Sequence, residues 1–447
     1  MRVAFIQKDP LTDPAMMVLG ASVVFRGHQA TVFIPAAERH LERAIRRFAP
    51  DAVVFAPPTG FHHWAIEQAR HLREITGGTP MLFTGTHATH HPEMAREDGV
   101  DLIMTGDPET TLPEILLKIS RAGGKARDLP GTTGTVTAKD DGSLIVGGER
   151  QVIDDLDDLP LADTEIYRRY RFVRAQTTLS FAVGRGVTEN THAGFRIGPK
   201  ELAARFCPAR RHSVGEAIRR LHLHTNRRTG YRRVAFRDDS LLMDKGEGWL
   251  EAFLARYRAE IGLPFSCLAR PDQLSDERIR MLAEAGCDRV RLGIESGDSE
   301  LRRSVTGVDY SNDSIRAVAG SLKDQGMAVH TINFLGIPGE TLETATRTLD
   351  LNIDIQPAHA FAILLNNEEG ASLSPELERM QLLMPLVVQF PALRGSALKA
   401  LRVSRPGLYQ RLFQTHHDWS FLTSGELAPR DILGIAARMR RTRNSAA

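Results

Sequence analysis

Cysteine is scarce in this chain of 447 residues, which holds only Cys207, Cys267 and Cys287. The number is odd, and no C-x-x-C pair occurs, so a disulfide framework, a local zinc knuckle and a redox dithiol are excluded. This usage predicts a reducing, cytoplasmic compartment. No apolar run reaches about 18 residues, and the first eight residues read as a strand, so we expect neither a membrane span nor a signal peptide.

An excess of either charge is also absent. Lys and Arg number 57 against 55 for Asp and Glu, a net charge of +2, which argues against nucleic-acid binding through bulk charge. The basic tail Arg438–Arg443 is typical of a solvated chain end. The hydrophobic fraction of 42% is ordinary for a globular protein, and the length favours two or three domains.

Short apolar strands alternate with helical stretches over residues 1–130. This pattern predicts an α/β, Rossmann-like domain with a parallel sheet covered on both faces and ligands at the carboxyl ends of the strands. The expected strands are Val3–Ile6, Ala30–Ile34, Ala52–Ala56, Met81–Gly85 and Leu102–Gly106.

Glycines and polar side chains follow these strands. Such loops let a backbone approach a large flat ligand closely. Five histidines also stand there, for which a metal or haem site is one hypothesis and polar rings beside a cofactor the other. The histidines are His62, His63, His87, His90 and His91.

Three further regions follow. Residues 131–172 read as a linker with a hairpin around Lys139–Gly142. Residues 173–370 resume the alternation and predict a partial (β/α)6 barrel. Residues 371–447 read as a small helical region. The expected barrel strands are Thr178–Val183, Arg233–Phe236, Phe265–Ala269, Arg289–Gly293, Val329–Leu335 and Ala360–Leu364.

Acceptor side chains stand at the ends of three barrel strands, in Phe236–Asp239, Gly293–Gly297 and Leu335–Thr341. Each combines a tight backbone with a carboxylate or hydroxyl, which suits ribose hydroxyls or an amino group. Any one of them alone is equally typical of a capped helix start. Three at equivalent strand ends favour a binding site.

The order and spacing of these strings over about residues 1–370 resemble the cobalamin-binding radical SAM family. On the N-terminal side the resemblance rests on Arg26–His28, Pro50–Val54, Gly85–Thr89 with Pro92–Glu93, and Val100–Glu109. On the other side it rests on Phe236–Asp239, Ala285–Cys287, Gly293–Gly297 and Leu335–Thr341.

The resemblance implies a Rossmann-like cobalamin domain followed by a radical-SAM-like barrel. The residues it places at cobalamin are Leu11, Thr12, Thr59, Gly60, Gly85, Thr86, His87, Gly106, Asp107 and Glu109. The residues it places at SAM or substrate are Asp238, Glu295, Ser296, Gly297, Gly336 and Glu340.

The chain departs from the family at the loop after the first barrel strand. There the family has C-x3-C-x2-C, whose thiolates hold an iron–sulfur cluster. This sequence has Val187, Thr191 and Gly194 at those positions, and none of them ligates iron as a thiolate does. We therefore expect no cluster and no metal at this loop.

A second departure is Leu11, which stands where many relatives have the histidine below cobalt. Base-off cobalamin without a histidine ligand is therefore implied.

Without a cluster, no electron source cleaves SAM. The remaining chemistry is polar methyl transfer using SAM or methylcobalamin, or cobalt-mediated bond formation such as cyclisation, on a small secondary-metabolite substrate. Glu189, His192 and Asp239 are the candidate acids and bases, from their position alone. The alternative is a non-catalytic cobalamin-binding sensor, carrier or partner subunit. No nucleic-acid or membrane partner is expected, and the sequence leaves the oligomeric state open.

Overall fold

The computed structural model describes most of the chain, in two units. The described residues are 1–58, 61–121, 129, 131–148, 152–186, 209–228, 230–238, 241–242, 248–307, 309–365 and 374–402. The first unit holds the described residues up to Gln176 together with Ala209 and Arg210, and the second holds the described residues from Thr177 to Gly186 and from Arg211 onward.

The first unit is built on one sheet of seven strands in the order β2-β1-β3-β4-β5-β6-β7. The pairs from β2 to β5 are parallel, as the alternation in the sequence predicted. The strands are β1 (Arg2–Ile6), β2 (Gln29–Phe33), β3 (Ala52–Phe55), β4 (Met81–Phe83), β5 (Leu102–Met104), β6 (Thr135–Ala138) and β7 (Leu144–Val146).

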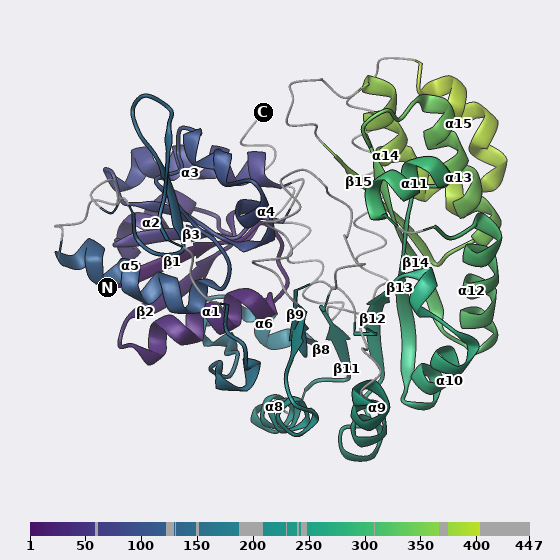
Figure 1. Ribbon diagram of the computed structural model, residues 1–447, viewed down its shortest axis with the longest axis horizontal. Coiled ribbons are helices and arrows are strands. Elements are labelled where there is room, and N and C mark those ends of the chain that lie inside the picture. The colour runs from purple at the N-terminus through teal and green to yellow at the C-terminus, as the bar shows by residue number, and fades with distance from the viewer. Residues whose placement is uncertain are drawn as a thin grey trace. The chain divides into compact units, whose positions relative to one another are not determined.

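Helices follow these strands and cover the sheet (Figure 1). The helices are α1 (Pro14–Phe25), α2 (Leu41–Phe48), α3 (His62–Thr76), α4 (Gly85–His90), α5 (Pro108–Arg121) and α6 (Arg171–Ala175), with 3-10 turns η1 (Pro35–Ala37), η2 (Pro92–Arg96), η4 (Leu156–Asp158) and η5 (Thr164–Tyr167). Helix α1 begins where the Asp13 carboxylate accepts from the amides of Ala15 and Met16, with Pro14 in its first turn. One face of α3 packs on the sheet through Ala65, Ile66, Ala69 and Leu72.

The hairpin within residues 131–172 is part of this sheet rather than of a free-standing linker. Strand β6 pairs antiparallel with β5 and with β7. The hairpin covers the outer edge of β5 and so extends the sheet. Its residues Thr135–Thr137 are buried there. The unit boundary falls at Gln176, after α6.

The second unit contains a six-stranded parallel sheet in the order β15-β14-β13-β12-β11-β8, the partial barrel that the sequence predicted. The strands are β8 (Thr178–Phe181), β11 (Arg233–Phe236), β12 (Phe265–Ala269), β13 (Cys287–Glu295), β14 (Ala328–Leu335) and β15 (His359–Leu364), and a separate pair consists of β9 (Gly184–Arg185) and β10 (Arg210–Arg211).

Helices α10, α12 and α13 lie along one side of β13 and β14 (Figure 1). The helices are α8 (Val214–Arg227), α9 (Trp249–Glu260), α10 (Asp276–Glu284), α11 (Ser299–Thr306), α12 (Asn312–Asp324), α13 (Leu342–Ile355), α14 (Pro375–Gln389) and α15 (Arg394–Ala400), with 3-10 turns η6 (Pro271–Gln273) and η7 (Pro391–Leu393). The last two helices fall in the region that we expected to be helical. No helix in the described part of the chain is both long and apolar enough to cross a membrane.

Candidate functional site

Glu295 is the last residue of β13 and has a left-handed backbone, with φ of 65°. Left-handed backbone is costly for a non-glycine residue, and such positions cluster at functional sites. The Glu295 side chain folds over Gly293, where an added Cβ would lie 2.8 Å from Oε1. Glycine at 293 therefore makes room for this carboxylate.

Burial raises the pKa of the Glu295 carboxyl to about 7, against a smaller lowering by Arg270 and Arg302. Its Oε2 atom is buried and has no hydrogen-bond partner among the described residues. An unsatisfied buried acceptor is costly, and native proteins pair nearly all such atoms. The carboxyl therefore suits a ligand that brings a donor.

Glu340 presents the same feature at the end of the neighbouring strand, β14. Its Oε2 atom accepts from the amide of Gly336 at 2.5 Å, so the carboxylate holds its own turn together. Its Oε1 atom is buried without a partner in the described structure, and burial raises the pKa of this carboxyl to about 7. Positive φ at Gly336 and Gly339 allows the tight turn.

The loop after Glu295 is clamped onto α13. The Gly297 amide donates to Thr348 Oγ1 at 2.8 Å. A Cβ at Gly297 would lie 2.4 Å from the Arg347 carbonyl oxygen, so only glycine fits there. The Ser296 hydroxyl accepts from the Asp298 amide at 3.1 Å, and Ser296 is fully buried.

Arg302 fixes this loop through hydrogen bonds of its guanidinium, a role that the sequence analysis missed. The Arg302 side chain is fully buried. Its guanidinium donates to the Ser296 carbonyl at 2.7 Å and to Asn312 Oδ1 at 2.9 Å, and also to the Tyr310 carbonyl. An arginine in the first turns of a helix carries no sequence signal that separates it from a surface arginine.

The helix-cap interpretation holds for some strand-end residues and not for others. Asp298 caps α11 and Thr341 caps α13 through their side chains. Glu295 and Glu340 cap no helix. The Glu295 and Glu340 carboxylates therefore remain candidate ligand-binding groups, because neither of them is used as a helix cap.

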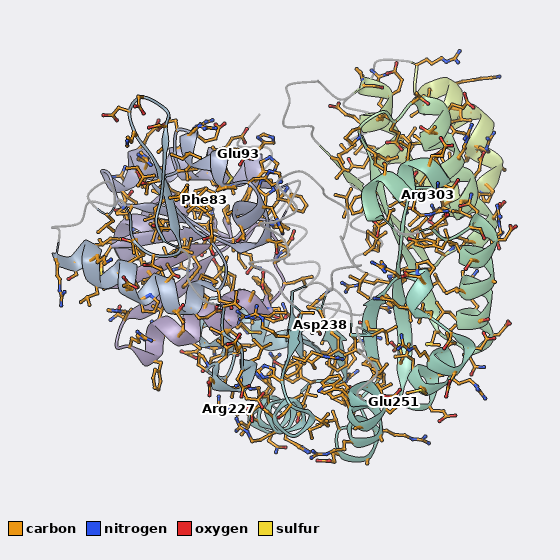
Figure 2. All side chains as sticks on the ribbon, viewed as in Figure 1. Phe83, Glu93, Arg227, Asp238, Glu251 and Arg303 are labelled. Carbon is orange, nitrogen blue, oxygen red and sulfur yellow. The ribbon has the colours of Figure 1, made fainter. Side chains whose placement is uncertain are left out.

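Asp238, labelled in Figure 2, follows β11 and joins that strand end to the end of β8. Its Oδ1 atom accepts from the amides of Val183 at 2.8 Å and Gly184 at 2.5 Å. The side chain thus fixes the backbone that leads into the loop at Val187. That loop, with Glu189, His192 and the positions Val187, Thr191 and Gly194, lies outside the described residues, as does Asp239.

The strand ends of the first unit form a second set. Gly85 and Gly106 have positive φ, and Thr89 links them because its hydroxyl donates to the Gly85 carbonyl at 2.9 Å and accepts from the Gly106 amide at 3.3 Å. Thr86 is exposed beside Gly85. The structure thus brings the loops after β4 and β5 together. Thr59 and Gly60 lie outside the described residues.

Asp107 serves a structural network. Arg210 Nη1 donates to its Oδ2 atom at 2.5 Å, and the Ile153 amide donates to the same atom at 2.8 Å. Arg210 was not anticipated, because over one hundred residues of sequence separate it from Asp107. Glu109 is buried in the first turn of α5.

Side-chain hydrogen bonds fix the loop after β1, where Leu11 stands in place of a ligand histidine. Gln7 donates to the Leu11 carbonyl at 2.5 Å, and the buried Thr12 hydroxyl donates to Gln176 Oε1 at 3.4 Å. The Leu11 side chain is half-buried. These contacts fix the loop backbone at the carboxyl end of the sheet.

Histidine rings lie against one another in this unit, stacked in the pairs His62–His87 and His87–His91 and tilted in the pair His62–His63. The centroids of His62 and His87 are 3.9 Å apart, those of His62 and His63 4.0 Å, and those of His87 and His91 4.6 Å. Burial, with the neighbouring rings, lowers the pKa of His87 to about 2. Among the described residues no group of three or more His, Cys, Asp or Glu side chains is placed to hold a metal ion.

Part of the chain matches a known family model. Residues 202–351, less than half of the chain, match the model of the radical SAM superfamily. Two sequence relatives are the heme chaperone HemW of Lactococcus lactis, 24% identical over 124 residues, and a tRNA-2-methylthio-N(6)-dimethylallyladenosine synthase of Staphylococcus epidermidis, 26% identical over 106 residues. These alignments cover 27% and 23% of this chain, and 32% and 20% of the relatives. The chain thus spans less than a third of the length of these curated relatives.

Solved structures extend the likeness to both units. The radical S-adenosylmethionine methyltransferase TsrM from Kitasatospora setae, with cobalamin and a [4Fe-4S] cluster bound, has a TM-score of 0.65 at 15% identity and covers 99% of each chain. The cobalamin-dependent S-adenosylmethionine radical enzyme OxsB, with aqua-cobalamin bound, has a TM-score of 0.59 at 14% identity and covers 80% of this chain and 53% of that one. Both likenesses show the fold: a Rossmann-like unit joined to a radical SAM half-barrel.

Proposed function

We propose that this protein is a cobalamin-dependent enzyme that uses SAM and a small-molecule substrate without an iron–sulfur cluster. Its reaction is polar methyl transfer or cobalt-mediated bond formation. The fold that it shares with TsrM and OxsB supports the two cofactors, and the match of residues 202–351 supports SAM.

The observation that carries the proposal is the pair of buried acceptors, Glu295 Oε2 and Glu340 Oε1. SAM bears an ammonium group, two ribose hydroxyls and an adenine amine, all of which donate hydrogen bonds. Since parallel strands end at the same edge of a sheet, β13 and β14 present both carboxylates on that edge. The residues present therefore fit SAM.

The cysteines support the cluster-free half of the proposal. A four-iron cluster is held by thiolates. Cys267 and Cys287 are buried in the apolar core of the second unit, and burial raises the pKa of the Cys287 thiol well above its usual range. Only Cys207 remains, and the three positions of the family motif hold Val187, Thr191 and Gly194.

The first unit fits cobalamin at the loops after β1, β4 and β5. Gly85 and Gly106 have positive φ there, and no histidine stands among residues 7–14 after β1. Cobalamin, when bound, supplies a cobalt nucleophile that can take a methyl group and pass it on. The residues of this chain would hold the ring and exclude water, and Glu189, His192 and Asp239 are the proposed proton carriers.

The test begins with the full chain reconstituted with hydroxocobalamin, iron and sulfide under reducing conditions. The expected protein has a base-off cobalamin spectrum and no bound iron, whereas about four iron atoms with labile sulfide per chain would overturn the cluster-free mechanism.

Calorimetry with SAM is then expected to show binding that E295Q and E340Q each weaken by about tenfold, since each loses an ionic acceptor. The exposed control E251Q (Figure 2) is expected to bind like the parent. Transfer of a labelled methyl group from SAM to cobalamin, followed by mass spectrometry, separates an enzyme from a mere cobalamin carrier.

A further inference from the structure

A cavity of about 530 Å³ lies in the first unit, on the side of α2. Its walls come from the segment that enters α2, from α2 itself and from one distant arginine. The lining residues are Glu38, Arg39, His40, Arg43, Ala44, Arg47, Phe48 and Arg169. None of them belongs to the sites described above.

The cavity is strongly cationic. Arg43 and Arg47 stand four residues apart on α2 and so share one of its faces, while Arg39 precedes the helix, whose N-cap residue is His40. All three are exposed, and none forms an ion pair among the described residues. Like charges at this spacing repel one another by a few tenths of a kcal/mol per pair, about 0.2–0.5. A bound anion would relieve that repulsion.

The one carboxylate that lines the cavity is already neutralised. Arg169 Nε donates to Glu38 Oε1 at 2.8 Å, and the Tyr170 hydroxyl donates to the same atom at 2.8 Å. Glu42, on α2, faces away to His71, whose Nε2 is 3.6 Å from its Oε1. Neither carboxylate therefore pairs with Arg39, Arg43 or Arg47, whose positive charges can interact with an anionic ligand.

Aromatic packing makes one wall rigid. The Phe48 ring meets Phe33 edge-on with centroids 5.6 Å apart, and the Arg169 guanidinium lies 4.4 Å from the centroid of the Phe33 ring. Flat groups of this kind accept a ring by stacking. The cavity therefore has one aromatic lining residue, Phe48, beside Arg39, Arg43 and Arg47.

We propose that this cavity binds a small phosphate ester that carries at least two phosphate groups and a flat ring, the class of a nucleoside diphosphate. Guanidinium groups bind phosphate oxygens in pairs. The volume falls in the range of small-molecule sites, roughly 300–1,000 Å³. A cavity bounded by Phe48 and Arg169 holds such a ligand better than it holds a nucleic-acid strand, which would use a flat basic surface. The proposal is independent of the SAM and cobalamin sites.

The experiment is calorimetric titration of the full chain with ADP, inorganic pyrophosphate and adenosine. We expect ADP to bind more tightly than pyrophosphate, and adenosine not to bind. The variants R43E and R47E are expected to weaken ADP binding by about tenfold or more, since each replaces a charged hydrogen-bond donor by a repelling group.

Arg46 provides the matched control, because it is an exposed arginine of the same helix that does not line the cavity. We expect R46E to change ADP affinity by less than about threefold, the size of a screened long-range effect. An equal loss in R46E and R43E would overturn the proposal in favour of a non-specific basic surface. Absence of ADP binding at millimolar concentration would also overturn it. Thermal melting of each variant verifies that these surface substitutions leave the fold intact.

Discussion

The Cys287 thiol donates to the Arg289 carbonyl oxygen at 3.4 Å, and Cys287 lies with Cys267 in one buried apolar cluster of the second unit. They come from neighbouring parallel strands, β12 and β13. Their side chains point to the helix-covered side together with Val290 and Leu292, away from the strand ends where Glu295 and Glu340 stand. Two of the three cysteines are therefore packing residues.

Alkylation tests this placement. We expect Cys267 and Cys287 to resist iodoacetamide at pH 8 in the native protein, because both are buried and the raised pKa of Cys287 keeps its thiol protonated. Both are expected to react once the chain is unfolded in urea. The measurement is mass spectrometry of the tryptic peptides, with Cys207 as the internal comparison. Rapid native labelling of both core cysteines would contradict the prediction.

The two buried carboxyls predict a pH dependence of stability. Because the folded pKa of Glu295 and of Glu340 is raised from the usual 4.5 to about 7, the native chain retains protons that the unfolded chain has released. The free energy of unfolding should therefore fall as pH rises from 4.5 through 7, and level off above that. In E295Q and in E340Q this slope is expected to shrink, with a gain of about 1–3 kcal/mol at pH 8.

Urea titrations at pH 5 and pH 8 measure this effect, with Trp249 of the second unit as the fluorescent reporter in a W64F/W419F background. The control E251Q removes an exposed carboxyl and should leave the slope as it is. A steeper loss of stability at pH 8 in E295Q would show that the carboxylate is stabilising, contrary to the prediction.

Adjacent arginines on α11 provide a matched pair. Arg302 is fully buried and bonds to three acceptors, whereas Arg303 is 54% exposed and pairs with Asp309. We expect R302M to lower the free energy of unfolding by about 2–4 kcal/mol, since buried acceptors lose their donor. R303M is expected to cost less than about 1 kcal/mol. Equal costs in denaturant titration would contradict a clamp at Arg302.

The histidine stack predicts the opposite pH response for the first unit. Because the folded pKa of His87 is lowered from 6.5 to about 2, the unfolded chain takes up a proton below pH 6.5 that the folded chain does not. Stability should fall as pH drops through that window, by about 1–2 kcal/mol between pH 7 and pH 5. The variant H87F keeps a ring against His62 and removes the titration, so its slope should be flatter.

Trp64 reports on this unit in a W249F/W419F background. The control H71Q changes a histidine that is 45% exposed and pairs with Glu42, and its slope should match the parent. If H87F loses stability on acidification as steeply as the parent does, the neutral state of His87 is not the cause.

The sequence alone was sufficient for the strands and the half-barrel of the second unit. Alternating apolar and helical stretches specify parallel strands, and parallel strands place whatever follows them on one edge. Glu295, Ser296, Gly297, Gly336 and Glu340 were predicted as site residues in this way, and their role stays a prediction. The same logic treated residues 131–172 as a linker, since a short hairpin in the sequence does not say which sheet it extends.

Tertiary structure decided which side chains meet across long stretches of chain. Arg169 reaches the cavity beside α2, Arg210 reaches Asp107, and Arg302 turns inward while Arg303 turns to solvent. It also gave Glu295 its left-handed backbone and left one oxygen of its carboxyl unpaired. Sequence patterns describe neighbours within a few residues, whereas burial and charge pairing depend on contacts that only the folded chain creates. The scarcity of cysteine was visible from the beginning, but the burial of Cys267 and Cys287 followed from the packing of two strands.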